Sequence, residues 1–186
     1  MIDCCIGLGA NLGDRMATLA RAVELLAHEE GFALRAISRA WETDAVGPPQ
    51  PRYLNAVARV GSMLSPRATL KRLLEMEEKL GRVRREKWGP REIDLDLLFY
   101  GNSVASGPIE LPHPRLHERA FVLGPLREIA PGLVHPALKK SVDELWLALT
   151  DETRAGAKTF GPIRRRLDGP DEMIEAPIDE AAAAAS

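Results

Sequence analysis

The chain has 186 residues and a nearly balanced charge, with 25 lysines and arginines against 27 aspartates and glutamates. This length suits one domain, which can bury about 70% of its unfolded surface without disulfides or structural metals. The net charge of -2 argues against a general binder of nucleic acids or of membrane surfaces, although a local charged patch would still matter.

The two cysteines, Cys4 and Cys5, are adjacent within an apolar N-terminal segment. They cannot build a disulfide framework, so we expect buried, reduced thiols. No apolar run approaches about 18 residues, and no charged leader precedes a hydrophobic stretch. We therefore expect a cytoplasmic protein that does not associate with membranes.

Strands and helices alternate along the first half of the chain. The segment "IDCCIGLGANLGDR" predicts a strand and a glycine turn, and a helix follows with apolar residues every three or four positions. The segments "FALRAISRAW" and "YLNAVARV" predict strands, separated by the proline-rich loop "ETDAVGPPQPR". A helix is then predicted from "SPRATLKRLLEMEEKLG", with Ser65 as its cap and Gly81 at its end.

The second half begins with a strand in "WGPREIDLDLLFYG", followed by a short strand near "IELP" and by helices around "HERAFVLGPLREIA" and "SVDELWLAL". The order β-α-β-β-α-β predicts an α+β fold with a ferredoxin-like core, in which helices flank a mainly antiparallel sheet. The pattern fades after Thr150. We therefore expect one domain over residues 1–150 and a peripheral, partly disordered extension over residues 151–186.

Two aspartates interrupt the otherwise apolar strand in the second half. Alternation along the strand places Asp94 and Asp96 on one face, roughly 7 Å apart. The opposite face would be apolar, with Ile93, Leu95, Leu97 and Phe99. Two neighbouring like charges repel each other, so the pair needs cations or hydrogen bonds for compensation.

A basic segment directly precedes these aspartates. Its lysines and arginines are Lys79, Arg82, Arg84, Arg85, Lys87 and Arg91. Carboxylate pairs suit Mg²⁺, which shares its coordination with water and substrate phosphates, and arginine binds phosphate oxygens in a bidentate manner. The residues thus indicate a magnesium polyphosphate site. The alternative is an internal salt-bridge cluster, in which the arginines only neutralise the aspartates.

Glu77 lies on the apolar stripe of its predicted helix, just before the arginines. A glutamate at such a position needs a partner and could face the same site, and a partly exposed structural role fits equally well. The glycine- and proline-bearing segments 43–52 and 81–91 could close over a substrate and exclude water.

Other familiar motifs do not match. The segment "GLGANLG" is one residue too long for the dinucleotide fingerprint, and the chain has no P-loop. His113 and His117 have helical spacing, but no neighbouring cysteine or glutamate completes a zinc site.

Aromatic residues offer a second indication of a ligand. Tyr53 and Asn55 share one strand face, and Phe121 follows the charged segment "RLHER". Two rings could hold a flat heterocycle while an amide reads its edge, with ordinary core packing as the alternative.

Four segments together resemble the 6-hydroxymethyl-7,8-dihydropterin pyrophosphokinase family of folate biosynthesis. They are "GLGANLGD", "ETDAVGPPQPRYLNAV", "LLEMEEKLGRVRREKWGPREIDLDLLFYG" and "LPHPRLHERAFVLGPLREIAP". The resemblance covers about residues 1–150. It implies an α/β sandwich with a ferredoxin-like core and transfer of the terminal diphosphate of ATP to the hydroxymethyl oxygen of the pterin, with release of AMP.

The resemblance also implies roles for individual residues. Asp94 and Asp96 would ligate two Mg²⁺ ions, and Arg82 and Arg91 would act with them in catalysis. The residues that bind ATP would be Arg82, Trp88, Arg91, His113 and Arg119. The residues that bind the pterin would be Thr43, Val46, Tyr53, Asn55 and Phe121. Asn11 and Glu77 would support the pocket and the metal site.

The partners implied are ATP and the pterin, with no nucleic acid and no membrane, and we expect a monomer. Two rival functions are a different Mg²⁺-dependent phosphoryl or nucleotidyl transferase on the same scaffold, and a ferredoxin-like RNA-binding module that uses the basic segment 79–91. Acidic residues on the sheet argue against RNA, because they would repel phosphates without a metal.

Overall fold

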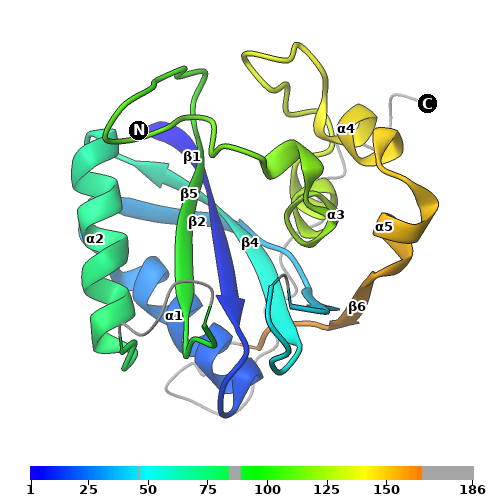
Figure 1. Ribbon diagram of the computed structural model, residues 1–186. Helices are drawn as coiled ribbons and strands as arrows, with labels where there is room; N and C mark the ends of the chain where they lie inside the picture. Colours follow the sequence, from blue (N-terminus) through cyan, green and yellow to red (C-terminus); the bar gives the residue numbers. More distant parts are fainter. Residues whose placement is uncertain (46, 84–88, 165–186) are drawn as a thin grey trace.

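A six-stranded sheet forms the centre of this computed structural model, which describes residues 1–45, 47–83 and 89–164 (Figure 1). The strands are β1 (Ile2–Ala10), β2 (Phe32–Ile37), β3 (Ala40–Thr43), β4 (Tyr53–Ser62), β5 (Asp94–Tyr100) and β6 (Ala157–Gly161). Five of them follow the order β5-β1-β4-β3-β6, and β2 also pairs with β4. All these pairings are antiparallel, as predicted.

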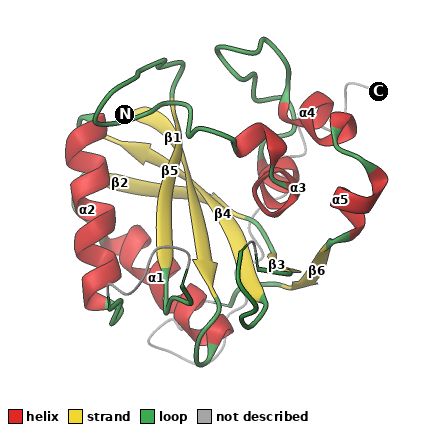
Figure 2. Cartoon of the chain, viewed as in Figure 1, coloured by secondary structure: helices red, strands yellow, loops and turns green. Residues whose placement is uncertain are grey.

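Helices lie on both faces of the sheet (Figure 2). The first face packs against α1 (Arg15–His28) and α2 (Pro66–Lys79), and the apolar core between them includes Leu19 and Leu73. The second face packs against α3 (Ala120–Ile129) and α4 (Val142–Ala148), with Leu123 and Trp146 in a separate core. The predicted α+β class with helices on both sides of an antiparallel sheet is therefore confirmed.

Local signals account for the ends of the helices. The Asp14 side chain accepts a hydrogen bond from the Ala17 amide at 3.0 Å at the start of α1, and Ser65 caps α2 in the same way. Gly81 adopts a φ of 86° just after α2, a conformation that costs glycine little. Ser141 and Glu144 form a capping box at the start of α4. Each of these helices lies where the sequence predicts it.

Strand β5 follows the predicted alternation only in its first part. Leu95 and Leu97 face the first core, while Asp94 and Asp96 face away from it. The pairing with β1 then shifts register, and Phe99 packs into the second core instead. The prediction that Phe99 shares a face with Leu97 is wrong, because a bulge reverses the alternation after Leu97.

The predicted strand in "FALRAISRAW" is divided into β2 and β3. The division lies at Ser38, whose hydroxyl accepts a hydrogen bond from the Val57 amide at 2.9 Å. A side chain thus replaces a backbone group in the ladder, which interrupts the strand. Thr43, assigned to the following loop by the sequence, belongs to β3. The short strand predicted near "IELP" is only an isolated bridge between Ala105 and Leu111.

The sheet continues past the boundary expected at residue 150. A short helix, α5 (Asp151–Ala155), leads into β6, which pairs with β3 and buries Ala157. Residues 158–160 are exposed because β6 is an edge strand, and this explains the weak apolar pattern in the sequence. The remainder of the expected extension, residues 165–186, lies outside the described residues.

Both cysteines are free and buried, as expected. Cys4 contributes to the first core and Cys5 to the second, and burial raises the pKa of each thiol to about 12. Among the described helices, none is both long and apolar enough to cross a membrane.

Candidate active site

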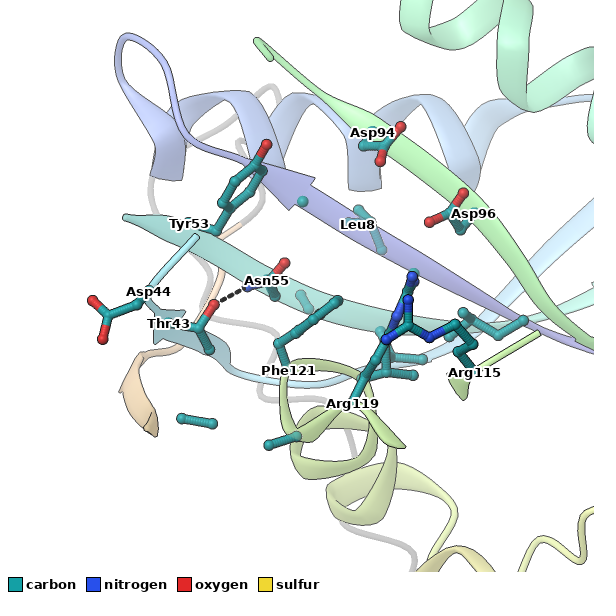
Figure 3. A pocket seen from close by; sticks show the side chains of 18 of the residues that line it. Leu8, Thr43, Asp44, Tyr53, Asn55, Asp94, Asp96, Arg115, Arg119 and Phe121 are labelled. Atoms are coloured by element: carbon teal, nitrogen blue, oxygen red, sulfur yellow. Dashed lines mark hydrogen bonds between the residues drawn. The ribbon is translucent and has the colours of Figure 1, made fainter. Parts of the chain in front are cut away.

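A cavity of about 510 Å³ opens on the part of the second sheet face that α3 and α4 leave uncovered (Figure 3). Its floor comes from β1, β4 and β5, and one wall comes from the segment between His113 and Val122. The 3-10 helix η1 (Leu116–Glu118) and the first turn of α3 belong to this wall. The cavity thus connects strands that are central in the sheet with a segment that follows β5 in the chain.

Two glycines of β1 lie in the floor of the cavity. Gly7 pairs with Asp96 on one side and Val57 on the other, and Gly9 pairs with Asp94 and Asn55. A Cβ atom on Gly9 would lie 3.1 Å from the Asn55 Oδ1 atom, so a side chain would crowd the amide. The two glycines therefore let the side chains of Leu98 and Asn55 pack closely against β1 at the cavity floor. This role was not predicted from the sequence, although glycine inside a strand often marks such a close approach.

Asp94 and Asp96 both project from β5 toward the cavity (Figure 3). Asp94 is neutralised by two arginines, with Arg82 Nη1 at 2.7 Å and Arg91 Nη1 at 2.8 Å from its oxygens. No described residue forms a hydrogen bond or ion pair with the Asp96 carboxylate. Burial raises the pKa of Asp96, and the neighbouring Asp94 charge raises it further.

Arginine pairing thus describes one member of the acidic pair, and the Asp94 oxygens keep further lone pairs that a cation could use. The internal salt-bridge cluster describes Asp94, which has arginine partners on both oxygens. It does not describe Asp96, whose charge faces the cavity beside a second carboxylate. A cation bound between the two would relieve that repulsion.

Glu77 is 3% exposed at the end of α2 and supports β5 from behind the cavity. Its carboxylate accepts a hydrogen bond from the Leu95 amide at 2.6 Å and forms an ion pair with Arg82. Burial raises the pKa of this carboxyl to about 7. Since Arg82 also binds Asp94, one guanidinium joins Glu77 to the aspartate strand. The predicted partner of Glu77 therefore exists.

The donor set fits Mg²⁺ better than a metal enclosed by protein ligands. In the described part of the chain, no group of three or more histidine, cysteine, aspartate or glutamate side chains converges on one point. Two carboxylates at an open cavity are what Mg²⁺ uses when water and substrate phosphates complete its coordination. Asp94 and Asp96 could hold such an ion.

The opposite end of the cavity is aromatic. Tyr53 projects from β4 and Phe121 from α3, and Figure 3 shows the two rings on either side of the opening. Between them the Asn55 Nδ2 atom donates a hydrogen bond to Thr43 Oγ1 at 2.9 Å. Asn55 is 7% exposed, which fixes its amide at the edge of the slot. All four residues line the cavity, and Phe121 also packs against the second core, so the ring has both a packing role and a face toward the cavity.

Asn11 connects two segments that border the cavity. Its Nδ2 atom donates hydrogen bonds to Gln50 Oε1 at 3.0 Å and to the Pro51 carbonyl at 3.1 Å. Its Oδ1 atom accepts a hydrogen bond from the Arg91 amide at 2.7 Å. This buried amide therefore holds Arg91 against the loop after β3.

The remaining predicted residues divide into three groups. His113 and Arg119 line the cavity, where His113 Nδ1 is buried with no partner among the described residues. Arg82 forms an ion pair with Asp94 but does not itself line the cavity. Val46 and Trp88 lie outside the described residues.

His117 points away from the cavity toward His135, with 6.1 Å between the ring centroids. His113 and His117 therefore do not face a common site, although their spacing in the sequence is helical. Arg115, Glu118 and the α5–β6 residues 153 and 156–157 also line the cavity, and none of them was predicted from the sequence. They come from the turn at η1, from the short helix α5 and from the start of the edge strand β6, which are too short to show a periodic pattern.

Known proteins are similar to this chain in sequence. A family model described as 7,8-dihydro-6-hydroxymethylpterin-pyrophosphokinase matches residues 5–131. A 2-amino-4-hydroxy-6-hydroxymethyldihydropteridine pyrophosphokinase of Synechocystis sp. is 43% identical over 141 residues, which are 75% of this chain and 72% of the relative. A protein of the same name from Methylorubrum extorquens is 47% identical over 136 residues, which are 72% of this chain and 86% of that protein.

Solved structures support the fold. An HPPK-DHPS in complex with substrates superposes with a TM-score of 0.63 at 11% identity, covering 79% of this chain and 43% of that chain. The wild-type HPPK-DHPS of Plasmodium falciparum gives a TM-score of 0.59 at 13% identity, and the match covers 79% of this chain and 43% of that chain. The chain spans less than half the length of these two proteins.

Proposed function

The chain belongs to the 7,8-dihydro-6-hydroxymethylpterin-pyrophosphokinase family, and on this premise we propose that it transfers the terminal diphosphate of ATP to 6-hydroxymethyl-7,8-dihydropterin. The products would be the pterin diphosphate and AMP, as a step of folate biosynthesis. One observation carries the proposal: a single cavity holds a carboxylate pair at one end and an aromatic slot with an amide edge at the other.

The aromatic slot would hold the pterin. The rings of Tyr53 and Phe121 would stack on the two faces of the heterocycle, above the floor at Gly9. Asn55 and Thr43 would recognise its edge through the hydrogen-bonded pair already present. Val46 would also contact the pterin. This arrangement would direct the hydroxymethyl group toward Asp96.

The acidic end would hold the phosphates of ATP. Asp94 and Asp96 would bind two Mg²⁺ ions, and these ions, when bound, would neutralise phosphate charge and lower the pKa of the attacking hydroxyl. Arg91, Arg119 and His113 would contact phosphate oxygens directly. Arg82 would act through Asp94, since it lies behind that carboxylate and binds it. Trp88, which lies outside the described residues, would also contact ATP.

The reaction needs no covalent intermediate. The hydroxymethyl oxygen would form a bond to the β-phosphorus, the bond between that phosphorus and the α–β bridging oxygen would break, and AMP would leave with this oxygen. The hydroxyl proton would pass to solvent or to a nearby base. Such transfers depend mainly on positioning and charge stabilisation, which the fixed arginines and the anchored β5 strand would supply.

The substrates would be the only partners required, and we propose a monomeric protein without nucleic-acid or membrane partners. The catalytic domain would cover residues 1–150, and β6 would add an edge strand to its sheet through the connection at α5.

The test is incubation with ATP, Mg²⁺ and 6-hydroxymethyl-7,8-dihydropterin, with AMP and the pterin diphosphate followed by chromatography. We expect the two products in equal amounts, and no AMP when either the pterin or Mg²⁺ is omitted. Release of ADP or pyrophosphate in place of AMP would indicate a different transferase and overturn the proposal. Magnesium-independent, steeply salt-dependent RNA binding without turnover would favour the RNA-binding alternative.

A further inference from the structure

Arg115 occupies an unusual position on the cavity wall. It precedes η1 with a φ of 65° and a ψ of 8°, in the left-handed region that side chains other than glycine, asparagine and aspartate rarely adopt. Figure 3 shows its side chain beside that of Arg119, on the wall across from the aspartates. The backbone turn therefore presents a second guanidinium to the same space.

The turn that carries Arg115 is anchored firmly to β5. The His113 amide donates a hydrogen bond to the Leu98 carbonyl at 2.8 Å, two residues after Asp96. Leu116, directly after Arg115, is fully buried in the second core. The position of residue 115 relative to the aspartates is thus determined by the sheet and the core, while its long side chain can rotate.

Arg115 forms a weak ion pair with Glu118 that a ligand could replace. Its Nε atom lies 3.0 Å from Glu118 Oε2, and the two side chains are 61% and 53% exposed. An exposed ion pair of this kind contributes only about 0–1 kcal/mol. Arg91, by contrast, is held by Asp94 and by the Asn11 amide contact. Arg119 lies over the ring of Phe121, with its Cζ atom 5.5 Å from the ring centroid. Of the arginines that line the cavity, Arg115 is therefore the one whose contact is an exposed ion pair that an incoming anion can replace.

We propose that Arg115 is a further phosphate-binding residue, which leaves Glu118 and binds an oxygen of the ATP polyphosphate when the nucleotide enters. Glu118 holds the guanidinium at the cavity rim while the site is empty. A triphosphate with about four negative charges competes effectively with one exposed carboxylate, and guanidinium–phosphate hydrogen bonds are among the stronger ones in proteins. This inference rests on the proposed function, since it assigns the ligand of the same site.

The test is calorimetric titration with a non-hydrolysable Mg²⁺–ATP analogue. We expect Arg115→Ala to weaken binding about tenfold, because a charge-assisted hydrogen bond is lost. Arg115→Gly serves as the second variant, since glycine adopts the positive φ without strain and preserves the turn. Arg127→Ala is the matched control, because Arg127 pairs with Asp143 on the neighbouring helices, away from the cavity, and should change the affinity less than twofold.

Glu118→Gln tests the release step. Without the carboxylate, Arg115 no longer has to break an ion pair, so the analogue should bind about two- to fivefold more tightly. In the Arg115→Gly background the same Glu118→Gln change should have a clearly smaller effect on affinity, because only the repulsion between the Glu118 charge and the phosphates is then removed. In turnover assays, Arg115→Gly should raise KM for ATP and leave KM for the pterin unchanged, which general damage to the fold would not do.

Two results would overturn the inference while the proposed function stands. One is unchanged affinity for the analogue in both Arg115 variants, and the other is an equal loss of affinity in Arg115→Gly and Arg127→Ala. If the unmodified protein fails to bind the analogue and forms no AMP, the proposed function itself is wrong.

Discussion

The two faces of the sheet differ in how completely helices cover them. On the first face, α1 and α2 bury a continuous apolar layer that contains Ile6, Leu8 and Leu95. On the second face, α3 and α4 cover only part, and the uncovered part carries Gly7, Gly9 and the two aspartates. The same strands therefore serve stability on one side and ligand binding on the other.

This difference shows where polar residues can be placed at low cost. A charge in the first core would lose its hydration and find no partner, whereas Asp96 retains access to the cavity. Glu77 is the exception on the first side, and it is compensated by Arg82 and the Leu95 amide. The comparison therefore predicts that substitutions on the two faces have separable effects on activity and on stability.

The largest effect is expected for Asp96→Asn. The substitution should lower kcat roughly a thousandfold, since charge stabilisation dominates this type of transfer. The free energy of unfolding should change little or rise, because a repulsive carboxylate is removed. Asp143→Asn, at an exposed ion pair far from the cavity, is the control. Turnover of Asp96→Asn at the unmodified rate would contradict the metal assignment.

Leu73→Ala should lower the free energy of unfolding and leave kcat unchanged. Leu73 is fully buried in the first core, and truncation of such a side chain costs about 3 to 4 kcal/mol through lost burial and a residual cavity. Urea unfolding would measure this loss. In the folded state at low temperature, kcat should equal that of the unmodified protein. A large fall in kcat would show that the two faces are coupled.

Glu77→Gln should alter how stability depends on pH. The pKa of Glu77 is about 7 in the folded protein and near 4.5 when unfolded, so between these values only the folded state keeps the proton. The contribution of this group therefore falls as pH rises from about 4.5 to 7, by roughly 3 kcal/mol. Urea titrations at several pH values should show that the glutamine variant lacks this decline. An identical pH profile in both proteins would disprove the shifted pKa.

The smallest effect is expected for Gly9→Ala, on the floor of the cavity. The new methyl group would lie 3.1 Å from Asn55 Oδ1 and displace the amide at the aromatic slot. We expect KM for the pterin to rise about tenfold, equivalent to about 1.4 kcal/mol, with KM for ATP nearly unchanged. Gly132→Ala, where a Cβ would meet nothing within 4 Å, should leave both constants as they are. Equal constants for Gly9→Ala would show that the ring does not lie on β1.

Much of the fold follows from patterns that are local in the sequence. The helical periods and the caps at Ser65 and Ser141 predict α2 and α4, and alternation predicts the two faces of β4. The predictions were wrong where distant contacts decide the outcome. The bulge in β5 depends on its pairing with β1, and β6 is recognisable as a strand only beside β3.

The candidate site shows the same division. The chemical type of the acidic pair, of Glu77 and of the aromatic residues is evident from composition and spacing. The sequence does not show that Asp94 is paired with arginines while Asp96 is not, because this depends on which carboxylate the arginines reach in the folded chain. Gly7 and Gly9 also have no visible role until their neighbours across the sheet are known.

By itself, the sequence determined the helices, most strands and the residue types available for phosphate and pterin chemistry, because caps, periodicity and alternation act between residues close in the chain. Only the tertiary structure decided that Asp96 faces open space, that Arg115 reaches the same cavity and that glycines form its floor. Strand register and the incomplete helical cover bring these groups together from separate segments, and both depend on packing of the whole domain.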